Sequence, residues 1–312
     1  MSEYPTSPYA GLQIVDGPFQ KNGMPNMWTA AITNKRQLES EDQFFVSFAN
    51  AYRDAFGHGA PVDNITDWHE YMYCERCGNR KSIEEVYNID QYQTVEYLER
   101  EKYQTTTCED CDINMQYFFQ THNLIKIIRH RLFDKEAAFG SILLDENGRI
   151  YGFFLAWIET LQNAWEETWS TFFRENNISL QAFLADAEKN STGMLLPDTY
   201  ILHMGEVAQT LPSRHGDAFF SLLNGMFTAI PNEYLKLMGL GISKPQIRTF
   251  LYLIAAGCSE TFSIPNFNNQ EVILHGPAQK IHDEYALGLR GFIKKHAKLI
   301  RQCQKDLLPK NP

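Results

Sequence analysis

The chain of 312 residues lacks the features that mark secreted and membrane-spanning proteins. Residues 1–30 contain no basic segment followed by an apolar one, as a secretion signal would. Nowhere do about 18 apolar residues follow one another, the length that a transmembrane helix needs. The sequence therefore predicts a cytoplasmic protein with no membrane contact. With 44% hydrophobic residues, it can bury the core of one large domain or of two.

The chain also has fewer positively charged than negatively charged residues. Lys and Arg number 28 against 38 Asp and Glu, a formal net charge of -10. A protein that binds nucleic acid broadly needs Lys and Arg on its contact face, so we expect no such activity from the body of the chain. Residues 276–312 are the exception, with a net charge of +5 that leaves -15 on the remainder. Apolar residues recur there at helical spacing and predict a basic amphipathic helix, whose charged face is either solvated or bound to an anion or RNA.

Cysteine is scarce, but four of the six cysteines form two C-x-x-C pairs. Cys74 and Cys77 make the first pair, and Cys108 and Cys111 make the second. Two such pairs can offer four thiolates to one tetrahedral zinc ion. Two disulfides or a redox dithiol are the alternatives, but reducing conditions disfavour disulfides and a redox motif needs only one pair. Because all four ligands would be thiolates, the predicted zinc is structural, within an insertion at residues 67–111.

The order of apolar patterns along the chain is typical of an α/β protein. A strand at 27–34 is followed by a helix at 38–57 and, after the cysteine segment, a helix at 113–133. A hairpin at 137–158 precedes a helical insertion at 159–190, and a strand that begins at 200 leads into a helix that ends at 227. A strand at 234–242, a helix at 244–257 and short strands at 258–264 and 270–276 complete the order.

The hairpin is the clearest local signal. Two apolar runs flank "ENG", and Asn147-Gly148 favours a tight turn because both residues tolerate positive φ. The sequence therefore predicts two central strands here, with Leu143, Ile150, Phe153 and Leu155 in the core.

The stretch "LPSRHGDAFFSLLNGMF" places a basic pair and a glycine between a strand and an apolar helix. Gly216 could let the backbone turn closely around an anion, at which the following helix would point its free N–H groups. The alternative is an ordinary turn in which Arg214 and His215 are solvated.

This order of elements resembles the GNAT superfamily of acyl-CoA-dependent N-acyltransferases. The resemblance rests on "GRIYGFFLAWI" as third strand, "YILHMGEVAQTLPSRHGDAFFSLL" as fourth strand with its glycine turn, and "LMGLGISKPQIRTFLYLIAAGC" as fifth strand and helix. It implies a mixed central sheet flanked by helices over residues 27–275, interrupted by the zinc insertion and by 159–190, with 276–312 as an added helix. In "SRHGDA", Ser213 stands where the family's phosphate turn has Gln or Arg.

The resemblance also implies roles for particular residues. The donor, most simply acetyl-CoA, would be bound by the fourth strand and the turn, at Val207, Gln209, Arg214, His215, Gly216, Asp217 and Ala218. Glu206 would be the base that deprotonates the amine, or else a carboxylate in a salt bridge. Tyr252 would protonate the thiolate, or else belong to the core. Regular alternation along the strand puts His203 on the face opposite Glu206.

These observations favour an enzyme that transfers an acyl group from acyl-CoA to an amine of a small molecule or a protein, with a structural Zn²⁺. Two other classes stay open. One is a non-catalytic GNAT-like scaffold whose zinc element binds a protein partner. The other is a zinc-ribbon nucleic-acid module, which the acidic residues Glu75, Glu109 and Asp110 beside the cysteines disfavour.

Overall fold

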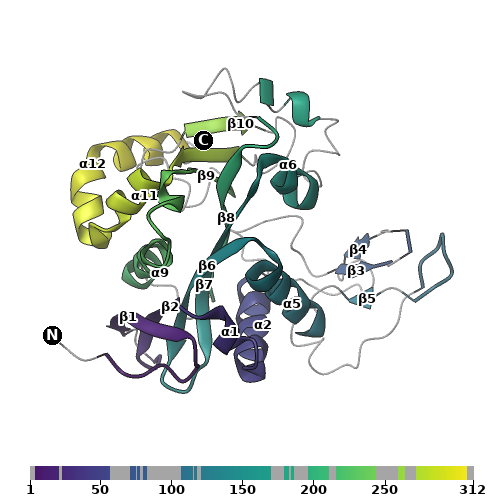
Figure 1. The fold of residues 1–312 in the computed structure, drawn as a ribbon, viewed down its shortest axis with the longest axis horizontal. Coiled ribbons are helices and arrows are strands. Elements are labelled where there is room, and N and C mark those ends of the chain that lie inside the picture. Colours follow the sequence, from purple (N-terminus) through teal and green to yellow (C-terminus); the bar gives the residue numbers. More distant parts are fainter. Residues whose placement is uncertain are drawn as a thin grey trace.

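The computed structural model describes residues 4–20, 23–56, 71–74, 76–77, 80–82, 107–114, 116–117, 121–169, 179–182, 184–185, 196–210, 216–243, 259–263 and 272–307. A sheet of eight strands runs through the molecule, in the order β1-β2-β6-β7-β8-β9-β11-β10 (Figure 1). Its strands are β1 (Leu12–Phe19), β2 (Met27–Ile32), β6 (Ala137–Asp145), β7 (Ile150–Thr160), β8 (Tyr200–Gln209), β9 (Met238–Ser243), β10 (Ser259–Ser263) and β11 (Val272–Pro277). Neighbours are antiparallel except β8 and β9, which are parallel.

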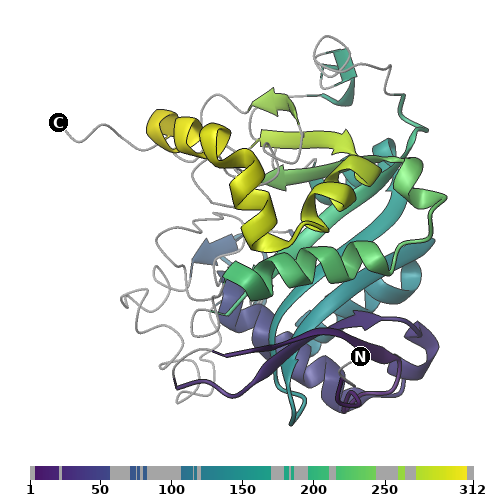
Figure 2. The same cartoon turned by 90° about the vertical axis from the view of Figure 1, so that its left-hand side faces the viewer.

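Helices cover both faces of this sheet. One face carries α1 (Lys35–Leu38), α2 (Asp42–Phe56), α5 (Thr121–Arg129), which continues as the π-helix η2 (His130–Asp134), α6 (Leu161–Ala164) and the π-helix η3 (Trp165–Trp169) (Figure 1). The other carries α9 (Gly216–Thr228), α11 (Ala278–Tyr285) and α12 (Gly288–Leu307), with the 3-10 turn η5 (Tyr234–Lys236) leading into β9 (Figure 2). The predicted α/β class, with a mixed central sheet flanked by helices, is therefore confirmed.

Alternation along β7 produces two cores. Phe153, Leu155 and Trp157 pack against α2 and α5, whereas Phe154 and Ala156 pack against α9, α11 and α12. Because both faces are covered, β7 reads as an unbroken apolar run. We call the first side of the sheet the α2 face and the second the α9 face.

The β6–β7 turn confirms the predicted hairpin and corrects its geometry. Among the described residues of the turn, only Gly148 has a positive φ, of 81°. The Gly148 N–H donates to the Asp145 carbonyl at 3.1 Å, so Gly148 is the last residue of a turn that begins at Asp145. It does not form a two-residue turn with Asn147. Leu143, Ile150, Phe153 and Leu155 are buried as predicted.

Other elements differ from the sequence-based expectation. Strand β1, which we did not predict, pairs with β2 at the edge of the sheet. The helix predicted at 113–133 begins only at Thr121, because Gln116–Tyr117 forms strand β5 and pairs with β3 (Tyr71–Tyr73). The tail contains two helices instead of one, and α11 and α12 both pack on α9. The helix predicted at 244–257 lies outside the described residues.

Candidate functional site

A β-bulge in β8 brings together side chains that regular alternation would separate. Leu155 pairs with Glu206 and Ala156 with Met204, which leaves Gly205 as an extra residue in β8. His203 pairs with Trp157 and Glu206 with Leu155, and both partners face α2. The expectation that His203 and Glu206 lie on opposite faces was wrong, because the bulge reverses the alternation between them.

The bulge depends on the absence of a side chain at Gly205. A Cβ added there would collide with Cη2 and Cζ3 of Trp157 and lie 3.2 Å from its Cε3. The indole is held in place because its N–H donates to Glu159 Oε1 at 2.7 Å. The guanidinium of Arg131 lies 4.7 Å from the centre of the same ring. Trp157 therefore connects the bulge to the charged residues around it.

Glu206 is buried at the bulge, and few groups around it stabilise its charge. Its side chain is 9% exposed, and the nearest charge is Arg131, whose Nε lies 3.5 Å from Oε1. Within the described part of the chain, neither carboxylate oxygen accepts a hydrogen bond of good geometry. Burial raises the pKa of Glu206, while Arg131 and the hydroxyl of Tyr52, which approaches from α2, lower it in part. A carboxylate with a raised pKa and unused lone pairs can accept a proton.

Glu159 lies on the same face but has a different environment. Lys135 Nζ donates to its Oε2 at 2.9 Å, and His203 Nδ1 and the indole of Trp157 bond to its Oε1. Burial alone would raise the pKa of Glu159, but the hydrogen bonds and charges of His203 and Lys135 lower it to about 2. Burial lowers the pKa of His203 more than Glu159 raises it. At neutral pH we therefore assign a neutral His203 that donates from Nδ1 to a charged Glu159, with Lys135 as the counter-charge.

The main chain of β8 offers a free edge beside the bulge. The β8–β9 ladder ends at His203–Leu240. The Thr210 N–H donates to the Tyr151 carbonyl at 2.8 Å, so antiparallel alternation turns the N–H groups of Val207 and Gln209 away from β7. No strand in the described ranges pairs with β8 along this edge. The two sequence-predicted donors thus point to the β9 side of β8, beyond the last residue pair of the β8–β9 ladder.

The start of α9 is only partly compatible with a phosphate cradle. Gly216 and Asp217 are exposed in its first turn, where main-chain N–H groups are available, whereas the side chain of Ala218 is buried against the sheet. A Cβ at Gly216 would lie 2.9 Å from Cδ2 of Leu289 in α12. Packing against α12 is therefore a second reason for a glycine here. Arg214, His215 and Tyr252 lie outside the described residues.

The four paired cysteines converge on one point. The short sheet β4-β3-β5, in which β4 spans Arg80–Ser82, leads from β3 directly into Cys74. A bridge between Thr107 and Asn114 closes the second pair. All four sulfurs lie within 4.8 Å of one another, and those of Cys77 and Cys108 are 3.6 Å apart. Thiolates about 2.3 Å from one zinc ion would be separated by about 3.8 Å, so the cluster fits this metal.

The cysteines are not paired as disulfides. Cys74, Cys77, Cys108 and Cys111 are free thiols, and Cys74 and Cys108 are buried. Hydrogen bonding to Cys77, together with burial and the charges of Cys74 and Cys77, raises the pKa of Cys111 to about 12. The cluster thus resists full deprotonation unless a cation joins it.

Sequence reasoning missed the residues that surround Glu206. Arg131 and Lys135 come from η2 and its C-terminal end, and Glu159 comes from the end of β7. A glycine inside a strand pattern often marks a bulge, so Gly205 was the one signal that could have revealed the shared face.

Within the described residues, no helix combines the length and apolarity required to cross a membrane.

Comparisons with known proteins find only remote similarity. No family model and no curated protein matches the sequence. A solved structure of a histone acetyltransferase and related acetyltransferase from Corynebacterium glutamicum is 15% identical, with 49% of this chain and 71% of that chain covered and a TM-score of 0.31. An N-acetyltransferase from Staphylococcus aureus is 11% identical, with coverage of 49% and 80% and a TM-score of 0.29. Likenesses this remote carry no functional conclusion.

Proposed function

We propose that the protein transfers an acyl group from an acyl-CoA, most simply acetyl-CoA, to an amine, with Glu206 as the base. The observation that carries this proposal is the coincidence of a buried carboxylate of raised pKa with a free main-chain edge at one bulge. Acyl transfer needs both features, since an amine must lose a proton and the thioester oxygen must be stabilised as it gains charge.

The proposed reaction assigns each step to a group of this chain. The N–H groups of Val207 and Gln209 bind the donor along this edge, one of them at the thioester carbonyl, and the first turn of α9 from Gly216 binds the pyrophosphate of the donor. The amine nitrogen attacks the carbonyl carbon, Glu206 takes the proton, and the carbon–sulfur bond breaks. Tyr252 returns a proton to the departing thiolate. The charge of Arg131 opposes the effect of burial and so limits the rise in the pKa of Glu206.

Glu206→Gln tests the base directly. The variant keeps the shape of the side chain, so coenzyme A should bind within about twofold of wild type in a calorimetric titration. Turnover with acetyl-CoA and a panel of amines should fall by about 10²-fold or more, the usual contribution of a general base. Glu146→Gln, at an exposed position on the β6–β7 turn, is the matched control and should be fully active. Wild-type protein that binds no coenzyme A at millimolar concentration would refute the proposal.

One observation favours the non-catalytic scaffold instead. Leu289 occupies the space beside Gly216, where a phosphate cradle would need room. Leu289→Ala distinguishes a donor site that α12 restricts from a contact that is only structural. If α12 restricts the donor site, coenzyme A affinity should rise in this variant, and if the contact is only structural, thermal stability should fall without any gain in affinity.

We further propose that Cys74, Cys77, Cys108 and Cys111 hold one structural zinc ion. Binding free energy at such a site becomes folding free energy, because the unfolded segment has no preformed site. Purified protein should contain about one equivalent of zinc per chain, and a chelator should release it while the 71–82 and 107–117 segments lose protection from hydrogen exchange. Cys77→Ser should lose the metal, whereas Cys303→Ser should retain it. Metal analysis that finds no zinc in wild-type protein would refute this proposal.

A further inference from the structure

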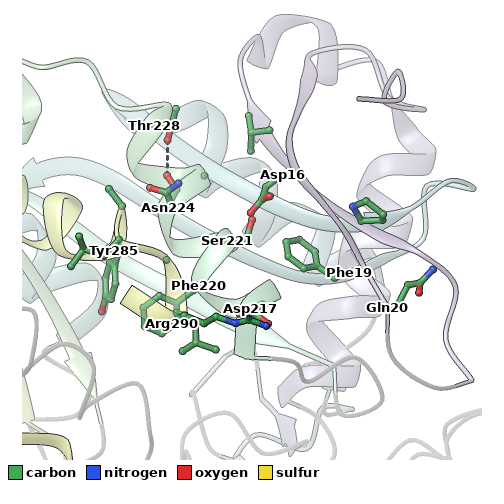
Figure 3. Close-up of a pocket in the computed structure, with 17 residues that line it drawn as sticks. Asp16, Phe19, Gln20, Asp217, Phe220, Ser221, Asn224, Thr228, Tyr285 and Arg290 are labelled. Carbon is green, nitrogen blue, oxygen red and sulfur yellow. Dashed lines mark hydrogen bonds between the residues drawn. The ribbon is translucent and has the colours of Figure 1, made fainter. Parts of the chain in front are cut away.

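A groove of about 730 Å³ lies on the α9 face of the sheet (Figure 3). Glu206 lies on the opposite face, because its partner Leu155 faces α2. Its walls are the end of β1, one side of α9 and the turn between α11 and α12. A volume of this size accommodates a small organic molecule. None of the residues assigned to the base or to the zinc cluster lines it.

The α9 wall is a polar stripe on a mostly apolar helix. Asp217, Ser221, Asn224 and Thr228 are spaced by four, three and four residues, so they follow one face of α9. The opposite side of the helix packs on the sheet through buried apolar residues. Thr228 is accounted for locally, because its hydroxyl donates to the Asn224 carbonyl at 2.8 Å. The other three offer side-chain oxygens to the groove.

Ser221 carries the strongest indication of a ligand. Its side chain lines the groove although the residue is only 6% exposed, and its Oγ has no hydrogen-bond partner among the described residues. Buried hydroxyls in folded proteins are nearly always bonded. Figure 3 shows the Ser221 side chain directed toward Asp16 of β1, with Asn224 one turn further along α9. A hydroxyl, a carboxylate and an amide thus gather in one part of the groove.

The charges in the groove are separated. Asp217 and Arg290 lie together at one end, because their neighbours Gly216 and Leu289 are in contact. Asp16 lies at the other end, where Oδ1 accepts the Gly17 N–H at 2.8 Å and no salt bridge forms within the described part of the chain. This end therefore presents a negative charge and hydrogen-bond acceptors without a cation.

Aromatic rings complete the wall. Phe19 of β1 lies beside Asp16, and Phe220 and Tyr285 line the α9 and α11 sides of the groove. Aromatic faces attract cations and also bury apolar groups. Carboxylate, hydroxyl and amide oxygens next to aromatic rings are the groups that hold an organic ammonium ion.

We propose that this groove binds a primary amine with an apolar or aromatic body, with the ammonium group between Asp16, Ser221 and Asn224. The ammonium supplies three N–H donors, one for each of these side chains. The apolar body lies against Phe19 and Phe220. The groove meets the proposed donor site at the first turn of α9, where Asp217 lines it, but the ammonium position lies away from that turn and does not depend on acyl transfer.

Phenethylamine is the probe for this groove, and 2-phenylethanol is its neutral counterpart of similar size. Calorimetric titration of the full chain without coenzyme A should show saturable binding of the amine, at least tenfold tighter than that of the alcohol. Asp16→Asn should weaken amine binding at least tenfold and Ser221→Ala severalfold, with little effect on the alcohol. Asp283→Asn, an exposed acid of α11 outside the groove, should bind like wild type.

Three results would overturn the proposal: no amine binding at 10 mM, equal binding of amine and alcohol, or an Asp16→Asn variant that binds the amine as wild type does. The concentration of 10 mM is roughly 10²-fold above a typical dissociation constant for a small ligand. The comparison of amine with alcohol uses only wild-type protein, so it holds even where a variant fails to fold. Coenzyme A titration of the same samples keeps the two proposals distinguishable.

Discussion

Gly205→Ala tests the bulge on which the geometry of the site depends. An added methyl group would collide with the outer ring of Trp157, which is confined by the hydrogen bond to Glu159 and by His203, whose ring centre is 4.6 Å away. If the indole moves, it loses a hydrogen bond to a charged acceptor, which costs about 2 kcal/mol. A strained side-chain rotamer adds about 1 kcal/mol. We therefore expect the free energy of unfolding to fall by about 3 kcal/mol, at the upper end of ordinary overpacking.

Urea unfolding followed by tryptophan fluorescence and by circular dichroism measures this loss. Gly239→Ala in β9 is the matched control, because its nearest contact would be 3.3 Å, and it should cost less than about 1 kcal/mol. Trp157→Phe lacks the outer ring, so the double variant with Gly205→Ala should be at least about 1 kcal/mol more stable than additivity predicts. Equal stability of the two alanine variants, or full additivity in the double variant, would refute the placement of Trp157 over the bulge.

Two further predictions concern the hairpin and the buried acid. Gly148→Val should destabilise the fold by about 2 kcal/mol, because a Cβ at a φ of 81° would lie 2.8 Å from the Tyr9 hydroxyl. Gly23→Val, at a φ of 80° in open space, should cost clearly less, and equal melting temperatures would disprove the clash. Glu159 has a folded-state pKa of about 2, below its ordinary value of about 4.5. Its ionised form therefore stabilises the fold fully above a pH of about 4.5. Wild type should therefore lose about 3 kcal/mol relative to Glu159→Gln as the pH falls from about 4.5 to about 2, and parallel stability curves would contradict this.

Strong local patterns were sufficient to predict the central part of the fold. The β6–β7 hairpin, α2, β8 and α9 each combine a periodic apolar pattern with a clear boundary, and all four occur. The four cysteines could be brought together from spacing alone, because two C-x-x-C pairs permit few arrangements. These predictions needed no knowledge of distant contacts.

Elements that depend on distant partners were missed. Strand β1 contains "DGP", which reads as a loop, and it forms only because β2 pairs with it. Gln116–Tyr117 has helical periodicity around it but pairs with β3. Arg131 and Lys135 are ordinary basic residues in the sequence, and their roles come from Glu206 and Glu159, which only the folded chain brings near them.

The two acids on the α2 face differ in the direction of their pKa shifts, and this difference supports Glu206 over Glu159 as the proposed base. Glu159 is held ionised by Lys135 and by hydrogen bonds, so it cannot accept a proton near neutral pH. Glu206, with Arg131 as its nearest charge, has a pKa that burial raises above its ordinary value, so it binds a proton more readily than Glu159. When the environments of two carboxyl groups separate their pKa values, the ionised one serves as an electrostatic anchor and the other as the proton carrier. Trp157 links them physically, because its N–H fixes Glu159 while its ring rests on Gly205, beside Glu206. Replacement of either acid should thus alter the other through the position of this indole as well as through charge.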